Sequence, residues 1–300
     1  MKTSLLKASY AMFTRYKTWL EKQPLAAHSK RAYRSRVNHF LVFLSQEDGD
    51  YMHALDDPKE RDFAVRDYKL HLKRSLKMQP TSVNSALTAI DHFYQFLGME
   101  PAKVRREDLP QLAPRALSKD EQKRFVRAAE RCRRAKDSAI ALLLFYTGMR
   151  IGECAALDLD DVSVIGRKNR VTIRSGKGEK YRVIPLHTEA VDALSKWIIE
   201  RGKKLKNKSS ESALFVNPQG KRLSTASLDL IIRKIGRDCG IELSAHVLRH
   251  TFLTTLVRSR NDLVLVAEIA GHKRLETTRR YTLPTLADQE RAIESVVVDE

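Results

Sequence analysis

The sequence has few cysteines, and they lie far apart. Cys132, Cys154 and Cys239 are the only three in 300 residues. An odd number with no pair at metal-ligand spacing argues against a disulfide framework and against a cysteine-held metal site. This scarcity predicts reduced thiols in a cytoplasmic protein.

Long apolar runs are also missing. The longest, Ala139 to Tyr146, is too short to cross a bilayer. Near the start of the chain, Lys7 interrupts the early apolar stretch, so the sequence predicts no secretory signal. We therefore expect a protein with no membrane partner.

Acidic residues are outnumbered by basic ones. The chain has 55 Lys and Arg against 37 Asp and Glu, a formal net charge of +18. Its apolar fraction of 42% is ordinary for a globular protein, and its length suits two domains that each bury a core. The positive excess predicts a polyanionic partner, with a merely basic housekeeping protein as the alternative.

Residues 1–98 are predicted to form a domain of four helices. The first, less regular helix is expected from about Ala8 to Glu21, and Pro80 is expected to begin the last. For each of the other three helices, apolar residues recur at helical spacing and mark one face. These faces comprise Tyr33, Val37, Phe40 and Leu44; Val65, Tyr68, Leu72 and Leu76; and Val83, Leu87, Ile90, Tyr94 and Leu97.

Two basic clusters occur in this helical part. One is a row at positions i, i+3, i+7 and i+11 beside an apolar face, and the other crowds the start of a helix. Either cluster alone is typical of a solvated helix face, but two on one small domain favour contacts with phosphates. The candidate DNA-binding residues are Arg66, Lys69, Lys73 and Lys77 in the row, and Lys30, Arg31, Arg34 and Arg36 in the second cluster.

Residues 99–117 are expected to be an extended linker, because prolines interrupt them and apolar periodicity is weak. From 118 to 300 the pattern mixes helices with a small β element. Short strands at Arg170–Arg174 and Tyr181–Ile184 flank Gly176-Lys177-Gly178 and predict a hairpin. One helix is expected to begin at the capping box from Ser118, and another to cover the buried run that ends at Tyr146. Further helices are expected near 188–204, 224–238, 246–259 and 262–270, with short helical pieces to 295.

Several polar residues suit chemistry on a phosphodiester. The negative charge on such a group must be held while a nucleophile attacks, and arginine does this best because its planar fork matches phosphate oxygens. Arg150 follows a Thr-Gly-Met turn and opens a helix, while His246 and Arg249 share one helix face. An isolated arginine is more often a surface ion pair, so the inference depends on the whole set.

Tyr281 is the candidate nucleophile. Its phenol needs a base or nearby positive charge, which His246 and His272 could supply. Lys177, between two glycines, could protonate the departing alkoxide, although a tight turn with a solvated lysine is the commoner meaning of Gly-Lys-Gly.

Two further residues have supporting roles in this set. Glu153 lies one turn after Arg150, where a structural ion pair and a direct role are equally open. His250 is expected only to form local hydrogen bonds.

Taken in order, these residues resemble the tyrosine recombinase (integrase) family. The matching segments are Thr147–Glu153, Gly176–Leu186, His246–Thr251 and Gly271–Thr282, and the step from His272 to Tyr281 has the family's length. The resemblance is strong over about 118–290. One departure is Ala270, where a leucine often precedes Gly-His; we expect it to affect packing rather than activity.

The resemblance implies a fold, a reaction and partners. The fold is mainly α with a small β-sheet: a helical core-binding domain and a mixed α/β catalytic domain that form a C-shaped clamp around duplex DNA. Strand transfer to the tyrosine gives a 3′-phosphotyrosine and a free 5′-hydroxyl, with no metal or nucleotide. In agreement, the sequence contains neither a carboxylate cluster for Mg²⁺ nor a G-x-x-x-x-G-K-[ST] loop.

The biological role is less determined. A homotetramer on inverted-repeat sites is implied, with the tail from Ala287 to Val298 packing on a neighbouring protomer or on its own domain. The early first helix leaves no room for an added arm-binding domain, which favours a resolvase-like enzyme of a mobile element or of replicon dimers. A topoisomerase of type IB and a non-catalytic DNA-binding regulator are the alternatives. No motif shows the target sequence, its spacer or any accessory protein.

Overall fold

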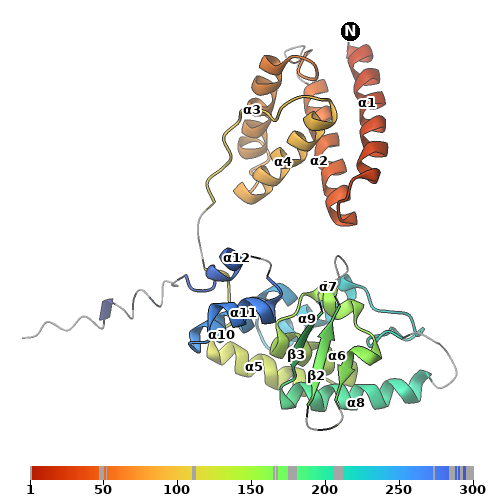
Figure 1. The fold of residues 1–300 in the computed structure, drawn as a ribbon, viewed down its shortest axis with the longest axis vertical. Coiled ribbons are helices and arrows are strands. Elements are labelled where there is room, and N and C mark those ends of the chain that lie inside the picture. Colours follow the sequence, from red (N-terminus) through yellow and green to blue (C-terminus); the bar gives the residue numbers. More distant parts are fainter. Residues whose placement is uncertain are drawn as a thin grey trace, which may run out of the picture. The chain divides into compact units, whose positions relative to one another are not determined.

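The computed structural model describes residues 2–46, 51, 53–109, 113–164, 166, 168–174, 181–205, 212–272, 274–283, 288, 290 and 293–294. The chain forms two compact units, Met1–Pro110 and Gln111–Glu300. Figure 1 shows helices in both units and strands only in the second. Lys177 and most of the C-terminal tail lie outside the described residues.

The first unit consists of the four predicted helices. They are α1 (Lys2–Lys22), α2 (Ala27–Gln46), α3 (Pro58–Arg74) and α4 (Pro80–Phe96). Their apolar faces meet in one core, where Phe40, Tyr68, Leu87 and Phe93 are almost fully buried. Leu76 is an exception, because α3 ends at Arg74 and leaves this side chain 45% exposed.

The segment after α4 is part of the first unit. Residues 99–109 were expected to belong to an extended linker, and they form no helix or strand. Arg61 donates to the Glu100 carbonyl, and the amide side chain of Asn84 exchanges two hydrogen bonds with the backbone of Glu107, each 2.8 Å long. The side chain of Arg106 also pairs with Asp91. Side-chain contacts therefore hold this extended segment where its own backbone forms no regular structure.

The second unit is built mainly from helices. They are α5 (Lys119–Glu130), α6 (Ala135–Thr147), α7 (Ile151–Ala156), a 3₁₀ turn (Leu159–Asp161), α8 (Thr188–Leu205), α9 (Thr225–Asp238), α10 (Ala245–Arg258), α11 (Leu263–Ala270) and α12 (Leu275–Arg279). The predicted capping box is present, with Ser118 and Glu121 bonded reciprocally. Helix α6 is apolar on all sides and is buried, with α5, α8 and α10 packed on it.

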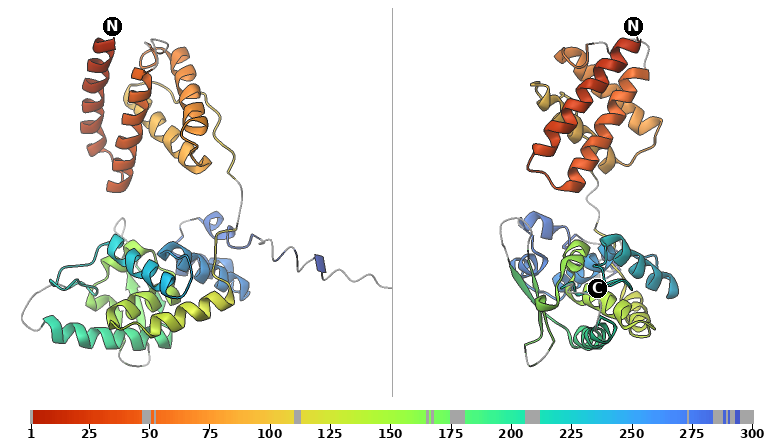
Figure 2. Two further views of the ribbon diagram at one scale, coloured as in Figure 1. Left: turned by 180° about the vertical axis from the view of Figure 1, so that it is seen from behind. Right: turned by 90° about the vertical axis from the view of Figure 1, so that its right-hand side faces the viewer.

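One small antiparallel sheet completes this unit. Its order is β1 (Val162–Ser163), β2 (Arg170–Ile173) and β3 (Arg182–Pro185), with Val171 opposite Ile184. The predicted hairpin strands are confirmed; the two-residue β1 was not predicted. In the right-hand view of Figure 2 the strands lie at one edge of the unit. The mainly α fold with a small sheet is therefore confirmed.

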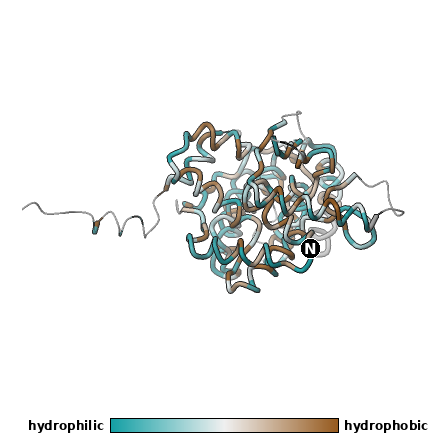
Figure 3. The backbone as a smooth tube through the Cα atoms, turned by 90° about the horizontal axis from the view of Figure 1, so that it is seen from below, coloured by the Kyte–Doolittle hydropathy of each residue, from teal (hydrophilic) through white to brown (hydrophobic). Residues whose placement is uncertain are grey.

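Hydrophilic (teal) and hydrophobic (brown) stretches are interspersed along the backbone in Figure 3. Over the part of the chain that is described, no helix combines the length and apolar character that a bilayer crossing needs. All three cysteines are free thiols, and burial raises the pKa of Cys132 to about 11.

Candidate active site

The site begins where α6 ends. Gly148 caps α6 with a left-handed φ of 56°, and a Cβ there would lie 2.3 Å from Cδ1 of Phe252 on α10. Glycine therefore lets the chain turn tightly against α10. After the buried Met149, Arg150 becomes the N-cap residue of α7, as the sequence predicts.

Arg249, on α10, is the buried cation of the site. Only 5% of it is exposed. Its guanidinium donates to the carbonyl of Gly148 at 2.7 Å and to that of Ala270 at 2.8 Å. These carbonyls end α6 and α11, where helix dipoles are negative, so they stabilise the charge directly. Burial, aided by the nearby Arg150, lowers its pKa to about 10, so it stays charged at neutral pH.

Glu153 holds two arginines beside this cation. It accepts from the guanidinium of Arg150 at 2.9 Å and from its backbone N–H at 2.7 Å. Burial alone would raise the pKa of Glu153, but hydrogen bonds from Arg182 and Arg150 outweigh it and lower the pKa. The carboxylate therefore stays ionised, and its observed contacts are those of an ion pair that positions arginines.

Arg182 was missed in the sequence analysis. From β3 it reaches both oxygens of Glu153, at 2.6 and 3.0 Å, and donates to the carbonyl of Ile269 at 3.0 Å. It also packs beneath Gly271, where a Cβ would lie 2.6 Å from its Nη1. A signal was present: in a strand, Arg182 shares a face with the buried Ile184 two residues on.

His272 lies between two partners. Its Nε2 is 3.0 Å from Nη2 of Arg249, and its Nδ1 is 2.8 Å from the hydroxyl of Thr278. Burial and the charge of Arg249 lower its pKa to about 4. His272 is therefore neutral at physiological pH.

Tyr281 is docked and protonated. It is 5% exposed, and its ring lies parallel to that of His272 with centroids 6.2 Å apart. Burial raises the pKa of the phenol, although Arg249, Arg280 and Arg150 oppose this. Three cationic side chains thus lie close enough to stabilise a phenolate once the ring is less buried.

The hydroxyl of Tyr281 bonds to His250, with the oxygen 3.0 Å from Nδ1. The expectation of purely local hydrogen bonds for His250 is therefore wrong, because α12 brings a residue 31 positions away against α10. Burial lowers the pKa of His250 to about 3. His246 is exposed and packs edge-on against His250, with ring centroids 4.0 Å apart.

The fold thus brings together Arg150, Arg249, His272 and Tyr281. His246 contacts His250, which in turn contacts Tyr281. An anion entering beside Tyr281 would meet arginine donors and neutral imidazoles, a setting that suits a phosphoryl group. Lys177 lies outside the described residues. Among those that are described, no three His, Cys, Asp or Glu side chains gather as metal ligands.

The basic residues of the first unit differ in how they are held. Lys77 is not on α3: the helix ends at Arg74 and Lys77 has a φ of 48°, so the predicted four-residue helical row is wrong at its last member. Lys69 and Lys73 pair with Glu107 at 2.7 and 2.8 Å. Their charge is therefore partly neutralised within the unit.

The other members of the two clusters differ in exposure. Arg66 lies over the ring of Phe63 at 4.8 Å, while the mostly buried side chain of Lys30 reaches Glu21 at 3.7 Å. Arg31 and Arg34 are exposed, and Arg36 is half-buried.

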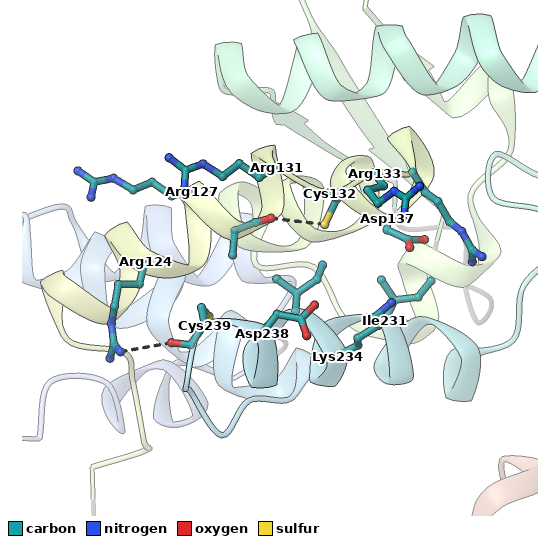
Figure 4. Close-up of a pocket in the computed structure, with 13 residues that line it drawn as sticks. Arg124, Arg127, Arg131, Cys132, Arg133, Asp137, Ile231, Lys234, Asp238 and Cys239 are labelled. Carbon is teal, nitrogen blue, oxygen red and sulfur yellow. Dashed lines mark hydrogen bonds between the residues drawn. The ribbon is translucent and has the colours of Figure 1, made fainter.

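A separate basic cleft lies between α5 and α9 (Figure 4). It has a volume of about 890 Å³, and arginines such as Arg127 and Arg131 line it together with Cys132. None of the active-site candidates borders it, so the hollow and the candidate chemistry are in different places on this unit.

Residues 115–287, more than half of the chain, match the Phage integrase family, and residues 13–100 match its N-terminal SAM-like domain. The chain belongs to the phage integrase family. It is therefore a tyrosine recombinase, an enzyme of DNA cleavage and rejoining. Neither the topoisomerase nor the non-catalytic regulator is favoured by these matches.

Similar proteins agree with this assignment. Tyrosine recombinase XerA of Pyrococcus horikoshii is 31% identical over 71% of this chain and 73% of its own length. Tyrosine recombinase XerC of a Roseiflexus species is 30% identical over 87% and 85%. The crystal structure of XerH bound to its difH substrate, before cleavage, has a TM-score of 0.70, with 22% identity over 89% of this chain and 79% of that one; it shows a shared fold.

Proposed function

We propose that this recombinase cleaves duplex DNA with Tyr281. The phenolic oxygen attacks the scissile phosphorus, a 3′-phosphotyrosine bond forms, and the bond from phosphorus to the 5′-oxygen breaks. The 5′-oxygen leaves with a proton as a free hydroxyl. A 5′-hydroxyl from a partner strand then attacks the phosphotyrosine and releases the phenol, so the cycle is balanced without a cofactor.

The observation that carries this proposal is the juxtaposition of Arg249, Arg150 and Tyr281. The arginines would hold the non-bridging oxygens as charge builds in the transition state. His272 and His246 would donate hydrogen bonds to the phosphate, and Lys177 would protonate the 5′-oxygen. Glu153 would keep Arg150 in place through the ion pair described above.

His250 joins the candidates for taking the proton of Tyr281, because it is the hydrogen-bond partner of the phenol. Burial, aided by the charges of Arg280 and Arg249, makes His250 a weak base. Binding of an anionic phosphate would raise the pKa of His250, so the substrate itself would make this histidine a stronger base.

We further propose how the rest of the molecule serves this reaction. Residues 1–98 would bind the core of the site, residues 99–117 would join the units, and 118–300 would carry catalysis as part of a clamp around duplex DNA. Exposed cations such as Arg31, Arg34 and Arg66 would contact phosphates, with Lys30, Arg36, Lys69, Lys73 and Lys77 nearby. A tetramer on two inverted-repeat sites in the cytoplasm, resolving or integrating a mobile element or resolving replicon dimers, fits this arrangement.

Supercoiled plasmids with no site, one site or two sites, taken from DNA flanking the gene, test the proposal. A recombinase yields recombinant products only from the two-site plasmid. Relaxation of all three plasmids without recombinants would indicate a topoisomerase, and binding without any strand breakage would indicate a regulator. Either of these two outcomes would contradict site-specific recombination.

A further inference from the structure

The two partners of His272 define where its proton lies. A guanidinium has only donors, so Nη2 of Arg249 must donate to Nε2 of the imidazole. A neutral His272 then carries its proton on Nδ1 and donates it to the hydroxyl oxygen of Thr278. In this form Nε2, the nitrogen that faces Arg249, has a lone pair and no proton.

This proton arrangement is the reverse of what a phosphate needs. A phosphate oxygen arriving beside Arg249 accepts hydrogen bonds, so His272 can help only if Nε2 carries a proton. Either the proton moves to Nε2, and Nδ1 then needs a donor, or the ring becomes an imidazolium, and Nδ1–H needs an acceptor. A hydroxyl can do both, because it rotates between donating and accepting.

We propose that Thr278 is a positioning residue whose hydroxyl holds His272 at Nδ1 in either proton state, so that Nε2 can donate to the scissile phosphate. This inference rests on the proposed function and names a residue beyond the predicted catalytic set. Thr278 would not touch the substrate; it would act through His272.

The place of Thr278 makes this role specific. It is fully buried on α12, and its carbonyl accepts from the backbone N–H of Tyr281 at 2.9 Å. One turn of chain thus carries both the nucleophile and the hydroxyl that holds His272. When α12 is docked, the phenol and the imidazole are placed together.

Charges from several elements face this imidazole. Arg249 on α10 acts most strongly, followed by Arg150 at the start of α7, Arg182 on β3 and Arg280 after α12. All four are cations and disfavour an imidazolium before the phosphate enters. The neutral ring is therefore the resting form, and its conversion to an Nε2 donor depends on the partner at Nδ1.

Three substitutions separate the hydroxyl from simple packing. Thr278→Val keeps the shape and removes the hydroxyl, Thr278→Ser keeps the hydroxyl, and Thr277→Val changes the neighbouring exposed threonine as a control. Single-turnover formation of the covalent adduct is measured on a nicked duplex carrying the chain's own site. Loss of one hydrogen bond predicts that Thr278→Val is about tenfold slower, with Ser and the control close to wild type.

A second readout excludes a general defect. Nitrogen-15 NMR of His272 reports which ring nitrogen is protonated, and the Thr278→Val spectrum should differ from wild type while non-covalent DNA binding stays the same. Equal rates and spectra for Thr278→Val and wild type would overturn the inference, as would equal slowing by Val and Ser. Failure of the wild-type chain to form any adduct would instead overturn the proposed function.

Discussion

The arginines near Tyr281 are stabilised in two different ways. Glu153 is the carboxylate that pairs with Arg150 and Arg182, while Arg249 is stabilised by helix-end carbonyls. Preorganised cations of this kind stabilise negative charge at no cost of reorganisation when it develops. A resting site with surplus positive charge is what a phosphodiester substrate requires.

The buried histidines make stability depend on pH. Folding lowers the pKa of His250 to about 3, against about 6.5 in an unfolded chain. As the pH falls below that ordinary value the unfolded state gains a proton that the folded state does not, so the free energy of unfolding falls. Thermal melting should therefore occur at lower temperature at pH 5 than at pH 7.

Replacing His250 isolates its share of this effect. His250→Gln cannot titrate, so the difference in melting temperature between pH 7 and pH 5 should shrink relative to wild type. His28→Gln, at an exposed position on α2, is the control. An undiminished difference in the His250 variant would show that other groups cause the acid sensitivity.

The roles of Lys177 and Arg150 can be separated by the leaving group. A 5′-bridging phosphorothiolate leaves as a thiolate without needing a proton, so it should restore cleavage by Lys177→Ala. It should not restore cleavage by Arg150→Ala, because that variant lacks charge stabilisation. Cleavage rates on oxygen and sulfur substrates provide the comparison, and equal rescue of both variants would refute the division of roles.

At the scale of elements, helix ends build the site. Gly148 ends α6, Gly271 ends α11, and Arg150 begins α7. The carbonyls exposed at the two C-terminal ends hold Arg249, and the left-handed glycines allow the close approaches. The ends of α6 and α11 and the start of α7 therefore orient the cations of the site.

Gly271→Ala tests the role of the end of α11. The residue has a φ of 64°, and a new Cβ would force Arg182 away from its position beside Glu153. Gly240→Ala is a matched control, since its φ of 69° carries a similar backbone cost, but its Cβ would meet only Arg124 at 3.8 Å. We expect Gly271→Ala to lower cleavage and melting temperature more than the control; equal effects would mean that only the backbone conformation matters.

The sequence predicted elements better than the contacts between them. The periodic apolar residues of α2, α3 and α4 and the two hairpin strands were sufficient to place those elements. The end of α3 before Lys77, the pairing of β1, and the contacts of Arg182 and His250 depend on residues far apart in the chain. Local patterns do not contain such tertiary partners, so these features required the fold.

At the scale of the whole molecule, surface charge should govern DNA affinity. Arg34 is exposed and makes no ion pair with the described part of the chain, so Arg34→Ala should lower the slope of log K against log salt by about one unit. Lys69→Ala should change the slope less, because Glu107 already pairs with this lysine. Binding titrations at several salt concentrations test this. An unchanged slope for Arg34→Ala would mean that this cluster is a solvated helix face that makes no phosphate contact.

The identity of the covalent nucleophile tests the account most directly. Wild-type protein is incubated with a nicked duplex that traps the cleaved state, and the DNA-linked peptide is mapped by mass spectrometry. We predict one adduct, on Tyr281, which Tyr281→Phe abolishes while non-covalent binding to the same duplex persists. An adduct on another residue, such as the exposed Tyr181, or an adduct that survives in Tyr281→Phe, would contradict the account.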